Sequence, residues 1–96
     1  MLRHIVMWKF HPEVSPEQKA EMKSRLEGLL GVVPGLKAVR VEEDALGKPG
    51  AMDMLLIADF EDSRALEAYA EHPEHLRAVE FIRPLVSSRA VVDFQT

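Results

Sequence analysis

Five consecutive apolar residues, Met54-Leu55-Leu56-Ile57-Ala58, decide the fold. They lie within an extended segment that runs from Met52 to Phe60. Because successive side chains of a strand point to opposite faces of a sheet, this strand is apolar on both faces. Strands of this kind lie at the centre of a sheet and are covered from both sides. The sequence therefore predicts one central strand and two faces that need cover.

Three further strands are predicted around this one. The first runs from Leu2 to Phe10 and carries a histidine, His4, in register with apolar side chains. Those side chains are Val6, Trp8 and Phe10. The segment from Leu36 to Glu42 alternates with one less apolar face, which is typical of a strand near a sheet edge. The last strand is expected from Leu85 to Phe94.

The first helix begins at Ser15-Pro16-Glu17-Gln18, with Ser at the N-cap, Pro at the first position and Gln three residues past the cap. Its apolar stripe is predicted to continue until Gly31 and the Val33-Pro34-Gly35 segment end it. The stripe consists of Met22, Leu26, Leu29, Leu30 and Val33.

A second helical region starts at the cap Asp62-Ser63. Its inward side is expected to comprise Ala65, Leu66, Ala68 and Tyr69. Because a residue before proline is disfavoured in helical geometry, Pro73 predicts a break at His72. Helical periodicity resumes at Glu74 and ends before Pro84, with an apolar stripe of Leu76, Val79 and Ile82.

The resulting order is βαββαβ, an α+β arrangement with a four-stranded antiparallel sheet. Two helices can cover only one face of such a sheet, yet Ile5, Met7, Leu55 and Ile57 point to the other. A second copy packed sheet against sheet would cover them, so a twofold homodimer is predicted. The polar segment from Glu43 to Gly50 is typical of a hairpin loop or a lid.

The composition excludes several classes of function. At 96 residues the chain is expected to be one small domain, 1–96, too short for a cofactor domain plus a substrate domain. A net charge of -4 with scattered basic residues gives no patch for nucleic acid or anionic membranes. Without cysteine there are no disulfides or thiolate sites. No leader pattern or membrane-spanning run is present, so a cytoplasmic location is expected.

The most informative motif for function is Tyr69-Ala70-Glu71-His72-Pro73-Glu74-His75. It places a phenol and two imidazoles at a helix break, where side chains can converge with His4 of the first strand. An imidazole such as His75 can act as general acid or base near neutral pH, and a phenol can hold a carbonyl oxygen. The alternative is structural. His75 would hydrogen-bond to backbone groups that the helix break leaves unpaired, while Tyr69 and His4 would be core residues whose polar atoms are hydrogen-bonded within the protein.

His72 is predicted mainly as a helix-ending residue. A metal site is its rival, because His72 and His75 are three apart and Glu71 or Glu74 could add a carboxylate. Pro73 interrupts the turn between the two histidines, and no further ligand motif completes a coordination sphere. No metal is therefore predicted.

The first-strand His4-Ile5-Val6-Met7-Trp8-Lys9-Phe10 segment, together with the Tyr-x-x-His-Pro-x-His motif, resembles the stress-responsive α/β-barrel (Dabb) family. The resemblance implies a ferredoxin-like fold and a dimer whose sheets form a barrel-like core. Members include plant stress proteins and a polyketide cyclase, in which residues matching Tyr69 and His75 handle proton transfer. That cyclase has a cavity histidine where this chain has Met54, which implies a more apolar ligand here.

The expected site is a small, mostly apolar pocket between helices and sheet, lined by His4, Trp8, Met54, Tyr69 and His75, with His72 as a further ligand-binding candidate. It would take a small cyclic or aromatic carbonyl compound, with Tyr69 and His75 as the catalytic pair and no cofactor. Two alternatives stay open. One is a non-catalytic stress-response or structural assembly protein, and the other is a monooxygenase, including a heme enzyme, on the same dimer architecture.

Overall fold

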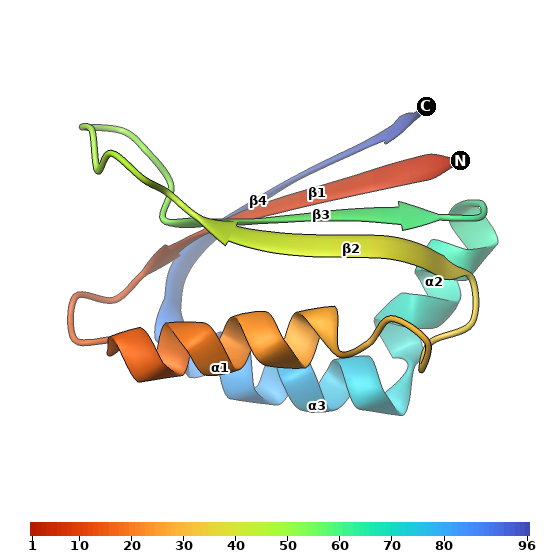
Figure 1. Cartoon of the computed structure of the whole chain (residues 1–96), viewed down its shortest axis with the longest axis horizontal. Coiled ribbons are helices and arrows are strands. Elements are labelled where there is room, and N and C mark those ends of the chain that lie inside the picture. The colour runs from red at the N-terminus through yellow and green to blue at the C-terminus, as the bar shows by residue number, and fades with distance from the viewer.

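The four strands form one antiparallel sheet in the order β2-β3-β1-β4 in a computed structural model that describes residues 1–96 (Figure 1). The strands are β1 (Leu2–Phe10), β2 (Leu36–Glu43), β3 (Met54–Phe60) and β4 (Val86–Gln95). The helices are α1 (Pro16–Glu27), α2 (Ser63–Glu71) and α3 (Pro73–Ile82), followed by a short 3-10 turn, η1 (Arg83–Leu85). The predicted ferredoxin-like α+β fold is confirmed.

The central position predicted for β3 is also confirmed. It pairs with β1 from Leu2↔Phe60 to Trp8↔Met54, and on its other side with β2, which lies at the edge as expected. Alternate side chains of β1 and β3 are buried, and the intervening ones are half-buried. The buried set points toward the helices, and this side of the sheet is the inner face.

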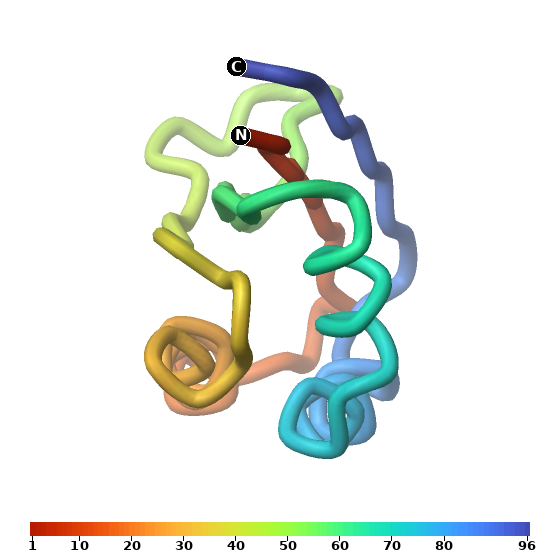
Figure 2. The backbone as a smooth tube through the Cα atoms, turned by 90° about the vertical axis from the view of Figure 1, so that its right-hand side faces the viewer, coloured from red at the N-terminus to blue at the C-terminus, as the bar shows by residue number.

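Helices α1 and α3 lie side by side across the inner face, and α2 lies at one end of the sheet (Figures 1 and 2). Apolar side chains of the helices and of the inner face form one continuous core. Its most completely buried side chains are Phe60, Met22, Met54, Leu56 and Val41. No helix is long and apolar enough to cross a membrane.

Helix α1 is shorter than predicted. The capping box at Ser15 and Gln18 forms as expected, but the helix ends at Glu27 with Gly28 as its C-cap. Glycine has a low helix propensity because of its backbone freedom, and after Gly28 the chain continues in turns, in which the Leu29 and Leu30 amides donate to the carbonyls of Leu26 and Glu27. Leu29 and Val33 are buried from turns instead, and Leu30 is 47% exposed.

Gly35 shows why the chain turns where it does before β2. Its φ is +85°, and a Cβ there would lie 2.5 Å from the Cβ of Ala65 in α2. Only glycine allows both this left-handed backbone and this close approach. The turn therefore holds α2 against the start of β2.

The predicted break at His72 is confirmed. His72 is extended, with φ -66° and ψ 134°, and it is both the C-cap of α2 and the N-cap of α3. The buried stripe of α3 differs in part from the predicted one. Ala78 and Ile82 are buried, whereas Leu76 is 50% exposed. Ala68 of α2 is exposed too, contrary to expectation.

The outer face of the sheet carries no helix (Figure 1). Register places the half-buried Ile5 and Met7 of β1 beside Ile57 and Leu55 of β3 on this face. On the other side of β1, Val92 and Phe94 of β4 extend the same surface. Their exposed fractions are 57% and 41%. The predicted second apolar face is therefore present and uncovered within the chain.

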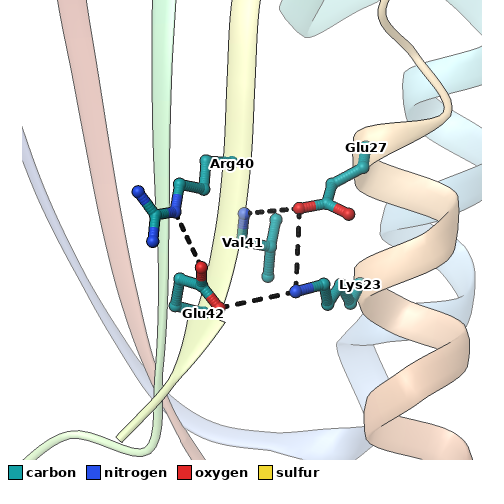
Figure 3. Close-up of polar contacts among 5 residues, drawn as sticks. All are labelled: Lys23, Glu27, Arg40, Val41 and Glu42. Carbon is teal, nitrogen blue, oxygen red and sulfur yellow. Dashed lines mark hydrogen bonds and ion pairs between the residues drawn. The ribbon is translucent and has the colours of Figure 1, made fainter.

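The free edge of β2 is protected by side chains from α1 (Figure 3). The Val41 amide donates to Glu27 Oε2 over 3.0 Å, so an edge N–H that no strand pairs is satisfied. Lys23 Nζ lies 3.9 Å from Glu27 Oε2 and 3.4 Å from Glu42 Oε1. Arg40 Nε donates to the other oxygen of Glu42 over 2.7 Å. Charge and pairing together disfavour addition of a further strand at this edge.

Candidate ligand-binding cavity

A cavity of ≈ 320 Å³ lies between the inner face of the sheet and α3. Its lining comes from β1, β3, β4 and all three helices. The lining residues are His4, Val6, Trp8, Leu26, Leu56, Tyr69, His75, Val79, Ile82, Arg83, Val86 and Arg89. The structure thus brings together His4, Trp8, Tyr69 and His75, as the sequence predicted, although the roles assigned to them stay predictions.

Tyr69 reaches the cavity from the last turns of α2. Its side chain is 3% exposed and packs edge-on against Phe60, with ring centroids 4.9 Å apart. No protein group hydrogen-bonds its hydroxyl, and no fully enclosed polar side-chain atom lacks a partner, so the hydroxyl reaches the accessible space of the cavity. Burial raises the pKa of Tyr69 to about 12, against a small opposing effect of the Arg89 charge. The phenol therefore stays protonated and can donate a hydrogen bond to a ligand.

His75 lies in the first turn of α3, with its ring 4.2 Å from that of Tyr69. Its Nδ1 is 3.2 Å from the Ala70 carbonyl oxygen. A carbonyl can only accept, so Nδ1 carries the proton and Nε2 keeps a free lone pair. Helix α3 starts afresh at Pro73, and this places the ring against the end of α2.

Burial lowers the pKa of His75 below its usual value. The hydrogen bond to Ala70 acts in the opposite direction, and nearby groups add to the lowering: His4, Arg89 and His72. The imidazole is therefore neutral at pH 7. Next to it the phenol is a hydrogen-bond donor. A neutral base beside a protonated phenol is suited to removing a proton next to a carbonyl whose oxygen the phenol holds.

His4 has a partner that sequence reasoning missed. Its Nδ1 lies 2.5 Å from Asp93 Oδ1, and the two residues are direct partners in the β1–β4 ladder. The carboxylate accepts a hydrogen bond from Nδ1–H, so this bond fixes the orientation of the ring, and Nε2 of His4 has no hydrogen bond within the protein. His4 also contacts Phe60 edge-on, with centroids 6.1 Å apart. Only the strand register, which composition does not reveal, brings Asp93 to this position.

Two predicted site residues, one from the expected lining and one further ligand-binding candidate, lie outside the cavity. Met54 is 2% exposed in the core opposite Trp8, and it borders a separate hollow beside the β2–β3 loop. Leu56, two residues further along β3, lies in the cavity wall, where Met54 was expected. The His72 ring is occupied at the start of α3, where its Nδ1 accepts from the Glu74 amide over 3.1 Å. Because α3 begins at Pro73, His72 is its N-cap residue, and its ring caps the helix.

The charged residues of the lining were also missed, since neither Arg83 nor Arg89 belongs to a motif. Arg83 lies in η1 and Arg89 lies on β4. No group of three histidine, cysteine, aspartate or glutamate side chains is placed to hold a metal ion. His72 and His75 thus do not form the core of such a group.

The sequence model of the protein family described as Stress Responsive A/B Barrel Domain (Dabb) matches residues 2–96 of this chain. This chain belongs to the Dabb family. A dimeric ferredoxin-like protein of unknown function from Thermobifida fusca is 28% identical to this Dabb chain, with a TM-score of 0.89, and the match covers 99% of this chain and 90% of that one. No protein of curated function matches the sequence.

Two enzymes share the Dabb fold at lower identity. The hydroxynitrile lyase of Passiflora edulis has a TM-score of 0.85 at 17% identity, over 97% of this chain and 90% of that one. An antibiotic biosynthesis monooxygenase has a TM-score of 0.79 at 20% identity, over 100% and 98%. At these identities the likeness shows the fold alone. The resemblance found in the sequence is thus confirmed for family and fold.

Proposed function

We propose that this Dabb chain is a homodimer that binds a small cyclic or aromatic carbonyl compound in the cavity of each subunit. Tyr69 and His75 move a proton beside that carbonyl, without a cofactor. The observation that carries the proposal is the position of the Tyr69 phenol, whose ring centroid lies 4.2 Å from that of the His75 imidazole in the wall of one mostly apolar cavity. The raised pKa of the phenol and the lowered pKa of the imidazole support the same roles. A volume of ≈ 320 Å³ lies within the range of small-molecule pockets.

The dimer is supported by the uncovered outer face and by the dimeric Thermobifida fusca protein. Ile5, Met7, Leu55 and Ile57 form the centre of an apolar surface on a small domain, and such surfaces mark interaction sites. A second copy offers a matching surface by symmetry. The cavity lies on the other face, so pairing through the outer face leaves it free for a ligand.

The proposed step follows from the two side chains. The ligand oxygen accepts a hydrogen bond from the Tyr69 hydroxyl, and His75 Nε2 takes a proton from the carbon next to the carbonyl. That C–H bond breaks, its electron pair moves into the enolate, and the Tyr69 hydrogen bond stabilises the charge on oxygen. Return of the proton from His75 to the same carbon completes an exchange. Alternatively, the enolate carbon attacks a second carbonyl of the same ligand: the new C–C bond closes a ring, the π bond of that carbonyl breaks, and the resulting alkoxide takes the proton from His75.

The hydroxynitrile lyase shows that this architecture hosts enzymes, which is general support for turnover. A monooxygenase role has only the shared fold in its favour, so we do not propose it. The non-catalytic assembly role is favoured if the cavity neither binds nor turns over carbonyl compounds.

Hydrogen–deuterium exchange of 2-tetralone in D₂O, followed by proton NMR, tests the step without knowledge of the natural substrate. We expect exchange above the buffer rate with the wild-type chain and a return to the buffer rate in His75→Ala. In Tyr69→Phe the loss is expected to be about 100-fold, since one donor to the oxyanion is removed. His11→Ala removes an imidazole outside the cavity and is the matched control.

Melting temperatures of the same variants separate function from folding. The proposal requires His75→Ala to lose exchange while it melts close to the wild type. Equal loss in His11→Ala, or no exchange above buffer together with no ligand-dependent NMR shift of His75, would contradict the proposal.

A further inference from the structure

The charges that line the cavity are all of one sign. The chain has 16 acidic and 12 basic residues, yet no aspartate or glutamate is among the twelve lining residues. The lining has two permanently charged side chains, Arg83 and Arg89. An acidic protein therefore presents a locally cationic cavity.

The two arginines occupy a distinct part of the lining. They are its only exposed residues, whereas Val6, Leu26 and Leu56 are at most 3% exposed. The cavity thus has an apolar floor and a cationic mouth. Arg83 reaches the mouth from η1 at the end of α3, and Arg89 reaches it from β4, where it is paired with Trp8 of β1.

Neither arginine has an acidic partner in the chain. Four other arginines form ion pairs with carboxylates: Arg3, Arg25, Arg40 and Arg77. Asp93, the acidic residue on the same face of β4 as Arg89, is bonded to His4 instead. The positive charge of Arg89 also acts on Tyr69 and His75, lowering the pKa of each. The guanidinium is thus close to the proposed reactive pair and free to bind an anion.

We propose that the ligand carries a carboxylate, which Arg83 and Arg89 bind at the mouth while the apolar body of the ligand lies on the cavity floor. Guanidinium groups match a carboxylate with paired hydrogen bonds, and two guanidinium charges at one mouth both attract it. This inference rests on the proposed function, because it names the substrate class of the same cavity. A carbonyl deeper in the ligand then faces Tyr69 and His75.

The test uses two ligands of nearly the same shape, 2-naphthoate and its neutral amide, 2-naphthamide. Binding is followed by the NMR shifts of the His75 ring and the Tyr69 ring. We expect the wild-type chain to bind 2-naphthoate at least about tenfold more tightly than 2-naphthamide. Arg83→Gln and Arg89→Gln should each reduce 2-naphthoate affinity by about tenfold and leave 2-naphthamide unchanged.

Arg64→Gln is the matched control. Arg64 lies exposed on α2, outside the cavity, so its removal changes the net charge equally without changing the mouth. Equal affinity of the wild type for both ligands, or equal weakening of 2-naphthoate by Arg64→Gln, would overturn the carboxylate inference and leave the cavity proposal standing. Absence of binding by both ligands would overturn the cavity proposal as well.

Discussion

The inner and outer faces of the sheet are built from the same alternating strands, yet they are covered in different ways. On β1, His4 and Trp8 point inward beneath the helices, while Ile5 and Met7 point outward, where no helix lies. The inner face mixes aromatic, imidazole and aliphatic groups and leaves a cavity. The outer face is aliphatic at its centre. The even-numbered residues of β1 can thus line a ligand cavity, while its odd-numbered residues can form an interface between subunits.

The effect of removing an apolar side chain therefore depends on which surface buries it. Phe60 on the inner face is fully buried by its own chain, whereas Phe94 on the outer face is 41% exposed. Removal of the Phe60 ring should therefore lower the folding stability of a single chain. Removal of the Phe94 ring should weaken the association of two chains.

The largest effect is expected for Phe60→Ala. Removing a fully buried ring that contacts both His4 and Tyr69 should lower the free energy of unfolding by about 3 to 5 kcal/mol. Phe94→Ala should cost less than about 1 kcal/mol at low protein concentration, where association contributes little. Urea denaturation of both variants checks this difference. Similar losses for the two phenylalanines would remove the distinction between the faces.

The next largest effect is expected when a charge is placed on the outer face, where it should weaken the dimer. Val92→Glu puts a carboxylate beside Ile5 in the proposed interface, and we expect the dimer dissociation constant to rise at least about 100-fold, or about 3 kcal/mol. Val91→Glu is the matched control, because Val91 pairs with Val6 and faces inward on the same strand. Sedimentation velocity measures both. A wild-type chain that stays monomeric at high concentration would refute the outer-face dimer.

Features fixed by local sequence were predictable. The alternation of β1 and β3, the capping box at Ser15 and the break before Pro73 depend on a few neighbouring residues, and all three are found. Errors arose where an apolar pattern outlasted its element. Gly28 ends α1 before Leu30. On α3 the buried residues Ala78 and Ile82 are four apart, and Leu76 lies off that stripe at 50% exposed.

The candidate site was predictable only in part. Tyr69, His75 and His4 could be brought together because a helix break and an inward strand position both leave a signal. The His4–Asp93 bond depends on the register of β1 with β4, which no residue pattern fixes. Met54 faces inward as predicted, but the cavity lies further along β3, where Leu56 forms part of its wall.

Burial of the inner face can be tested through the tyrosine, which is the only one in the chain. Its pKa of about 12 predicts that phenolate absorbance appears well above pH 10 in the folded protein. An unfolded chain ionises near its usual value of 10.0, so it binds fewer protons than the folded chain between the two values. Stability should therefore fall as the pH rises from 10 toward 12. Ultraviolet titration detects the shift, and a normal tyrosine titration of the folded chain would contradict it.

The smallest effect is expected at His75, and it has the opposite dependence on pH. Its pKa is lowered on folding, so below about pH 6.5 the unfolded chain binds more protons than the folded one. Stability should then decrease as the pH falls from 7 through the folded pKa. His75→Asn should lose this part of the pH dependence, whereas Val92→Glu on the outer face should retain it. Unfolding free energies between pH 5 and 7.5 test the difference, and parallel curves for the wild type and His75→Asn would show that burial of this ring does not control its protonation.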